Sequence, residues 1–111
     1  MNNNFALERA VLASVLNGEV QADLDPNYFQ APFHKKLVNG INRLKELDMP
    51  VDFELLRNKF LKSGKWSFQE DNALIELMTH TMPFSTQMLF DAYYDVLKRD
   101  YKMNLDRRLA I

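Results

Sequence analysis

Residues 32–47 read PFHKKLVNGINRLKEL and carry the clearest helical pattern of the chain. Pro32 suits a first helical position, because its ring fixes φ and the missing N–H would have had no partner within the helix. Apolar residues then recur every three or four positions on one face, with cationic residues elsewhere. The recurring residues are Phe33, Leu37, Ile41, Leu44 and Leu47. The segment is therefore predicted to be an amphipathic helix that packs against others.

Apolar residues also recur at helical spacing before this segment. A helix is predicted over about residues 5–16, and Gly18 supplies the left-handed residue that commonly ends one. The pattern breaks between residues 20 and 31, where Asp25-Pro26-Asn27 is typical of a turn. Only a short helix fits before that turn.

Two further helices are predicted after residue 50. Asp52 is placed to cap the first, which ends near Gly64. The second begins with Ser67 and Glu70 in a capping-box pattern and runs to about Thr81. Such local signals place the helix ends without any tertiary information.

A last helix is predicted after Met82-Pro83, with Ser85 as a candidate cap. Its apolar stripe consists of Leu89, Tyr93, Val96, Leu97, Tyr101, Leu105 and Leu109. A small domain has little core to spare, so this stripe is expected to be buried against a second copy or a continuing chain. The stripe therefore predicts oligomerisation.

The chain as a whole is predicted to be a single all-α domain. It has 111 residues, which leaves no room for an ATPase domain, and no alternating run bounded by hairpin turns indicates a strand. The absence of cysteine excludes a disulfide framework and a thiolate nucleophile. With no signal-peptide pattern and no membrane-length apolar run, a cytoplasmic location is expected.

No motif for catalysis, metal or nucleotide binding emerges from the sequence. The Gly-rich loop that holds nucleotide phosphates is missing. His34 and His80 lie on different predicted helices without a ligand-spaced partner on either, so both are expected to be structural. Aromatic residues interleaved with cations near the C-terminus are typical of a single-strand stacking surface, but their helical spacing favours packing.

Charge alternates along the chain in blocks. The formal charge is −3 over residues 1–31, +4 over 32–65, −5 over 66–97 and +3 over 98–111, for a net charge of −1. The near-neutral total argues against a duplex-binding module. The alternation is compatible with a surface that binds another protein, although charge runs are usually only solvated faces.

Several motifs then occur in an order that resembles the N-terminal domain of bacterial replicative DNA helicases, the DnaB family. They are the run from Leu7 to Leu16, the spacing of Leu24, Pro26, Phe29, Pro32 and His34, the triplet Pro50-Val51-Asp52, the stop Leu61-Lys62-Ser63-Gly64, Met82-Pro83, and Ala92-Tyr93-Tyr94 with Arg107-Arg108-Leu109. The sequence departs from the family pattern at Ala13, where glycine is usual. It is also about five residues short before Pro26 and about three residues long after Pro83, as the family spacing implies.

The resemblance implies a compact bundle of about six helices, with a head over residues 1–83 and a C-terminal helical hairpin over residues 84–111. In that family such domains form a collar of dimers on a hexameric motor and receive the helicase-binding domain of primase. The ATPase motor, with its ATP and Mg²⁺, would lie outside this chain, which would hold no cofactor and contact DNA only through the parent protein. A helicase loader is a further expected partner.

The resemblance also implies roles for residues of the last helix. The expected protomer contacts are Tyr93, Leu97, Tyr101 and Leu105. Arg107 and Arg108 are expected near a partner surface.

Three alternatives stay open at this point. The first is the helicase-binding C-terminal domain of primase, which has a similar helical fold, although the segment Phe29-x-x-Pro32-x-His34 favours the helicase. The second is a stand-alone protein that loads or mimics a helicase, or binds single-stranded DNA. The third is an enzyme, which would require His34 or His80 to meet carboxylates from other helices.

Overall fold

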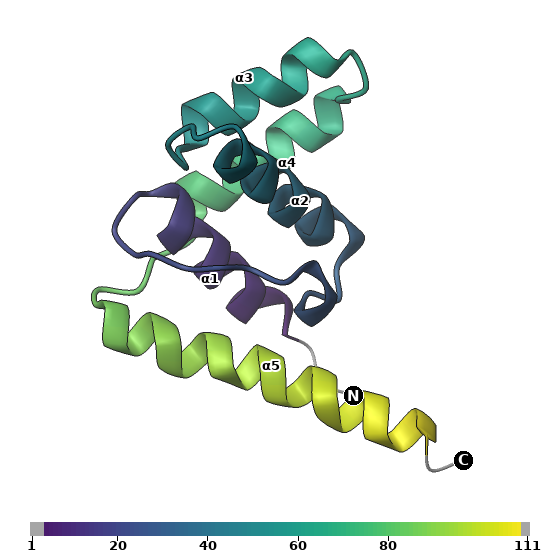
Figure 1. Ribbon diagram of the computed structural model, residues 1–111. Coiled ribbons are helices and arrows are strands. Elements are labelled where there is room, and N and C mark those ends of the chain that lie inside the picture. The colour runs from purple at the N-terminus through teal and green to yellow at the C-terminus, as the bar shows by residue number, and fades with distance from the viewer. Residues whose placement is uncertain (1–3, 110–111) are drawn as a thin grey trace.

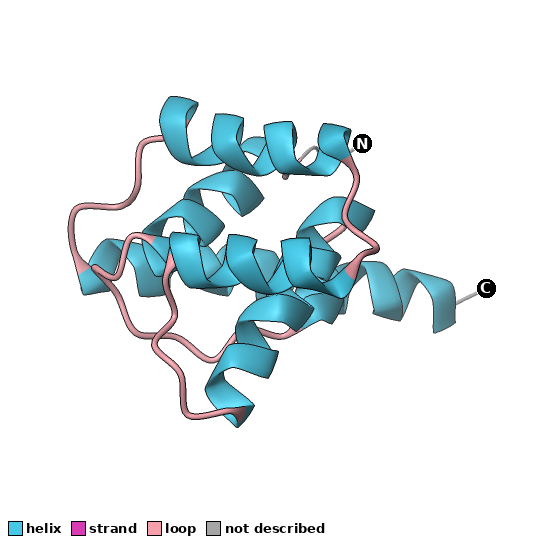
Figure 2. Ribbon diagram, turned by 90° about the horizontal axis from the view of Figure 1, so that it is seen from above, coloured by secondary structure: helices cyan, strands magenta, loops and turns pink. Residues whose placement is uncertain are grey.

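The computed structural model describes residues 4–109, and helices form all of the regular structure within that range (Figure 2). The elements are α1 (Phe5–Leu16), the 3₁₀ turn η1 (Pro26–Tyr28), α2 (Pro32–Glu46), α3 (Phe53–Ser63), α4 (Phe68–His80) and α5 (Gln87–Leu109). The all-α prediction is confirmed.

Helix α1 lies at the centre of the arrangement (Figure 1). It contacts α2 and α4 on one side and α5 on the other, while α3 packs on α2. The turn η1 bridges α2 and α5. Helices α3 and α5 therefore lie at opposite ends of the molecule (Figure 1).

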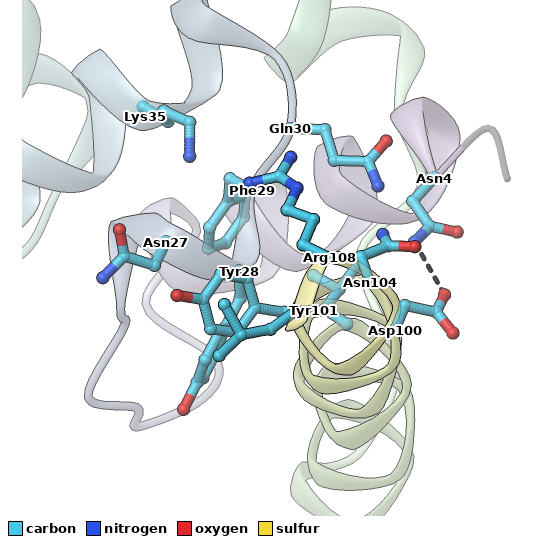
Figure 3. A pocket seen from close by; sticks show the side chains of 12 residues that line it. Asn4, Asn27, Tyr28, Phe29, Gln30, Lys35, Asp100, Tyr101, Asn104 and Arg108 are labelled. Carbon is cyan, nitrogen blue, oxygen red and sulfur yellow. Dashed lines mark hydrogen bonds between the residues drawn. The ribbon is translucent and has the colours of Figure 1, made fainter. Parts of the chain in front are cut away.

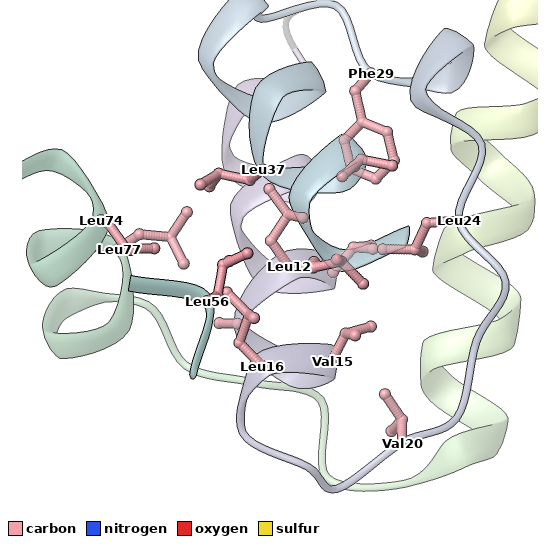
Figure 4. Packing of buried hydrophobic residues seen from close by; sticks show 14 of the residues in the cluster. Leu12, Val15, Leu16, Val20, Leu24, Phe29, Leu37, Leu56, Leu74 and Leu77 are labelled. Carbon is pink, nitrogen blue, oxygen red and sulfur yellow. The ribbon is translucent and has the colours of Figure 1, made fainter. Parts of the chain in front are cut away.

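The core forms where the apolar faces of these helices meet (Figure 4). Leu12 of α1 and Leu37 of α2 are fully buried, as are Leu56 of α3 and Leu74 of α4. Phe29, which follows η1, fills the space between α2 and α5. Each such side chain contributes about 1.5–3 kcal/mol by leaving water, so packing rather than helix propensity holds the bundle together.

The helix ends follow the local signals in the sequence. The Asp52 carboxylate accepts hydrogen bonds from the first free amides of α3. At the start of α4, Ser67 and Glu70 form both hydrogen bonds of a capping box, each 3.0 Å long. Gly64 follows α3 with a φ of 72°, where a Cβ would be strained. These predicted boundaries are confirmed.

The short helix expected before residue 25 is absent, because residues 18–25 run as an irregular or extended segment. Side chains of α2 hold this segment in place: Asn42 donates to the Leu24 carbonyl at 3.1 Å, and the Lys45 ammonium donates to the Ala22 carbonyl. The backbone groups are thus satisfied without a helix. Asp25 then accepts from the Asn27 amide and starts η1.

The expected C-terminal hairpin is also corrected. Residues 87–109 form one continuous helix, since the segment contains neither glycine nor proline to end it. A hairpin within residues 84–109 would need a second helix, and the described chain holds only α5 there. Residues 110–111 of the predicted hairpin lie outside the described range.

A charged network joins α3 to α4. The Arg57 guanidinium donates two parallel hydrogen bonds of 2.8 Å to the Asp71 carboxylate, and the Trp66 indole donates a third of 3.1 Å. The hydrogen bonds from Arg57, followed by that from Trp66, hold the pKa of Asp71 below its ordinary value of 3.8. The network therefore stabilises the fold while Asp71 is ionised.

Asp71→Asn is expected to lower the free energy of unfolding by about 1 kcal/mol near pH 7. Because the folded-state pKa of Asp71 is depressed, its contribution is present above the unfolded-state pKa and is lost as the pH falls through the folded-state value. Urea unfolding should thus show the gap between wild type and variant closing below about pH 4. A gap that stays constant down to about pH 3 would contradict this assignment.

Candidate protein-protein interface

The inner side of α5 is anchored in the head. Phe90 and Leu97, seven positions apart on the same face, are both buried. Between them, the Tyr94 hydroxyl accepts a hydrogen bond of 2.8 Å from the Asp25 backbone amide. Burial raises the pKa of the Tyr94 phenol, which stays protonated at neutral pH. These contacts fix the rotation of α5 about its own axis.

Tyrosine rings and polar pairs extend this attachment. The ring of Tyr28 lies 5.8 Å from Tyr94 and 5.5 Å from Tyr101, as measured between centroids. Gln87 accepts from the Gln21 amide at 2.8 Å and donates to the Gln21 carbonyl at 2.9 Å. The attachment therefore runs from the first turn of α5 to about residue 101.

Apolar residues also occur on a second side of α5, next to the buried one. We term the set Leu89, Ala92, Tyr93, Val96 and Met103 the outer strip. Its four large side chains are between 39% and 53% exposed. Their spacing of three, four and seven positions aligns them along the helix, over about 21 Å between Leu89 and Met103. A strip of this spacing is typical of a helix that packs against another helix.

Two features give the outer strip a defined shape. Tyr93 stacks on Phe84 with nearly parallel rings, at a centroid distance of 4.9 Å. The last turns of α5 extend past the head (Figure 1), and residues 105–109 are all exposed. The outer strip therefore lies on an exposed side of α5 that another chain can reach.

The four residues that the resemblance implied as protomer contacts lie in different environments in the structure. Tyr93 lies in the outer strip. Leu97 is 0% exposed and belongs to the core, so its expected role at a protomer interface is wrong. Tyr101 is half-buried against Tyr28, and Leu105 lies on the cavity side of α5 described below. Since each residue advances a helix by about 100°, Val96 faces outward while its neighbour Leu97 faces inward.

A cavity of about 450 Å³ lies between η1 and the C-terminal half of α5 (Figure 3). Tyr28, Tyr101, Leu105 and Arg108 are among the residues that line it. Arg108 extends from α5 toward the segment that carries Gln30 (Figure 3). By helical spacing Arg107 instead falls on the side of the outer strip, eleven positions after Val96. The two arginines thus lie on different sides of α5.

Glu8 and His34 form a buried hydrogen-bonded pair that no motif in the sequence indicates. His34 Nδ1 lies 2.7 Å from Glu8 Oε1, and each side chain is 1% exposed. Glu8 also accepts from the backbone amides of Gln30 at 2.8 Å and Ala31 at 3.3 Å. His34 thus meets a carboxylate across helices, yet the pair is closed to substrate and fully hydrogen-bonded, so it serves the fold.

The other predicted site features give no catalytic centre. His80 is exposed in the last turn of α4. Among residues 4–109, no group of three histidine, aspartate or glutamate side chains is arranged to hold a metal ion. Nor does any helix in the same range combine the length and the apolar character required to cross a membrane.

Two outer-strip residues, Ala92 and Met103, were not part of the stripe predicted from the sequence. Met103 follows Val96 by seven positions, so its spacing could have assigned it to the outer strip. Methionine packs against surfaces of varied shape because its side chain is flexible and polarizable. It extends the strip toward the basic end of α5.

The chain matches a known protein family. Residues 1–99 match the family described as the DnaB-like helicase N-terminal domain. The chain belongs to this family. No curated protein and no solved structure matches it. The matched range contains the outer strip as far as Val96 and ends before Met103 and the two arginines.

Membership of the DnaB-like family confirms the resemblance found in the sequence. It favours the helicase domain over the primase domain that was left as an alternative. It is also consistent with a domain that carries out no chemistry itself, in agreement with the closed Glu8–His34 pair. The departures before Pro26 coincide with the irregular segment that replaces the expected short helix.

Proposed function

We propose that this chain is an interaction domain of a cytoplasmic replicative DNA helicase and that it pairs protomers through the outer strip of α5. The pairing would build the dimeric collar of a hexamer whose motor domain unwinds duplex DNA with ATP and Mg²⁺. The exposed outer strip is the observation that carries the proposal. Membership of the DnaB-like family supports it.

The physical argument for pairing rests on the geometry of α5. Its inner face packs on the rest of the domain, and the large side chains of the outer strip remain 39–53% exposed within residues 4–109. Two copies packed strip to strip would remove the exposed parts of their large apolar side chains from water. Arg107, an exposed basic residue beside the strip, would help to set the register of the two helices.

We further propose that the domain receives the helicase-binding domain of primase, with Arg108 and the cavity beside η1 as the contact. The cavity combines aromatic walls with a cation, a combination that is common where proteins dock. A helicase loader is a second candidate for the same surface. Arg107, beside the outer strip, would act near the paired protomer instead.

Sedimentation equilibrium over a wide concentration range tests the pairing. The expected result is a reversible rise from the mass of one chain to that of two. A single-chain mass at every concentration would contradict it.

Titration calorimetry with the helicase-binding domain of primase tests the second contact. It should give saturable binding that Arg108→Glu weakens by about tenfold. Equal affinity of the wild type and the variant would exclude this contact.

A further inference from the structure

A second surface lies between α2 and α3, at the end of the molecule opposite α5 (Figure 1). We term it the α2–α3 groove; it encloses about 490 Å³. It is lined by Pro32, Lys35, Lys36, Asn39, Gly40 and Arg43 of α2 and by Leu56, Lys59, Phe60 and Ser63 of α3. The lining positions recur every three or four residues on both helices, so each helix contributes one continuous face.

The floor of the groove is apolar and rigid. At Gly40 the two helices approach so closely that a Cβ would lie 2.7 Å from both Leu56 Cδ1 and Phe60 Cζ. Phe60 is held in turn by parallel stacking on Trp66, with ring centroids 4.2 Å apart. The groove therefore keeps its shape without an occupant.

The rim of the groove is cationic. Among the described residues that line it there are four lysines or arginines and no carboxylate. Lys36 is paired with Glu70, and Arg43 makes a solvent-exposed pair with Glu46. Lys59 forms no ion pair with any residue that the structure describes. The Lys35 ammonium donates to the Pro26 carbonyl at 3.0 Å, so the unpaired positive charge of the rim lies at Lys59, beside the solvent-exposed Arg43–Glu46 pair.

This combination favours an acidic peptide over a nucleic acid. Single-stranded nucleic acid requires aromatic faces on which bases stack. Here Phe60 already stacks on Trp66, and the rest of the floor is aliphatic or glycine. An amphipathic helix instead places apolar side chains at a spacing that a groove between two helices accepts. The lining of α2 from Pro32 to Arg43 covers about 16 Å, or about three turns of such a helix.

We propose that the α2–α3 groove binds an acidic amphipathic helix of a partner protein. Leucine or phenylalanine side chains of that helix would contact Phe60 and Pro32, and its carboxylates would face Lys59 and Arg43. This surface is separate from the outer strip, so the chain can engage such a partner while it is paired. The proposal does not depend on the function proposed above.

The test uses a fluorescein-labelled synthetic helix of about 14 residues, with leucines at helical spacing and glutamates on both flanks. Fluorescence anisotropy should show saturable binding that weakens as salt is added. Lys59→Glu should weaken binding by about tenfold. Lys62→Glu makes the same charge change on α3 outside the lining, so it is the matched control and should retain the affinity to within about twofold.

One further protein variant and one further peptide test whether binding takes place in the groove and depends on apolar contacts. Asn39→Trp, a surface change that fills the groove without altering charge, should abolish binding. A peptide with serine in place of leucine should not bind. The proposal is overturned if Lys62→Glu weakens binding as much as Lys59→Glu, if a thymidine oligonucleotide binds the groove more tightly than the peptide, or if the peptide does not bind. It is likewise overturned if Lys59→Glu lowers self-association, because the occupant is then a second copy.

Discussion

Glu8→Ala is expected to lower the free energy of unfolding by about 2–4 kcal/mol, because a buried hydrogen-bonding group left without its partner costs about 1–3 kcal/mol. The carboxylate of Glu8 accepts from His34 and from the backbone amides of Gln30 and Ala31. Alanine would leave His34 Nδ1 without its partner in the core and would remove the acceptor of the two part-buried amides. The loss would therefore loosen the junction between α1, η1 and α2.

Urea unfolding followed by circular dichroism at neutral pH measures this effect. Glu19→Ala is the matched control, because Glu19 is exposed and should change the free energy of unfolding by less than about 0.5 kcal/mol. Glu8→Gln should fall between the two, since an amide keeps one acceptor oxygen but turns a donor toward its neighbours. If Glu8→Ala and Glu19→Ala were equally stable, the pair would have no structural role.

Val96→Asp is expected to raise the dissociation constant of the dimer at least about 100-fold, which corresponds to about 2.8 kcal/mol. Val96 lies in the middle of the outer strip, so strip-to-strip pairing would bury the new carboxylate in each protomer. The folded protomer should be little affected, because the side chain is 39% exposed before pairing.

Sedimentation equilibrium of Val96→Asp beside wild type gives the change in dissociation constant, and thermal unfolding monitors the protomer. Asn72→Asp serves as the control, since it adds the same charge at an exposed position of α4, away from α5. The control should dimerise like wild type. Equal weakening by both substitutions would point to net charge rather than to the outer strip.

Much of the fold could be predicted because its signals are local. The capping box of Ser67 and Glu70 involves residues three positions apart, and the stripe of α2 needs only helical periodicity. The irregular segment before Pro26 was not predictable in this way. Its conformation depends on Asn42 and Lys45, whose side chains reach it from α2 across about 20 positions of sequence.

The candidate site was predicted only in part, for a geometric reason. The stripe of α5 was found, but periodicity does not say which apolar face meets the head. The helix has apolar residues on two sides, so Leu97 was assigned to the interface while Val96 beside it proved to be the exposed one. The Glu8–His34 pair joins residues 26 positions apart, which no spacing rule connects.

Cysteine cross-linking tests protomer pairing through the outer strip most directly, because the chain has no cysteine of its own. Val96→Cys places a thiol in the strip, and Lys98→Cys places one on the exposed side of α5 away from it. With a short bismaleimide, the account predicts a covalent dimer for Val96→Cys and single chains for Lys98→Cys. Equal cross-linking of the two variants, or a dimer from Lys98→Cys alone, would contradict pairing through the outer strip.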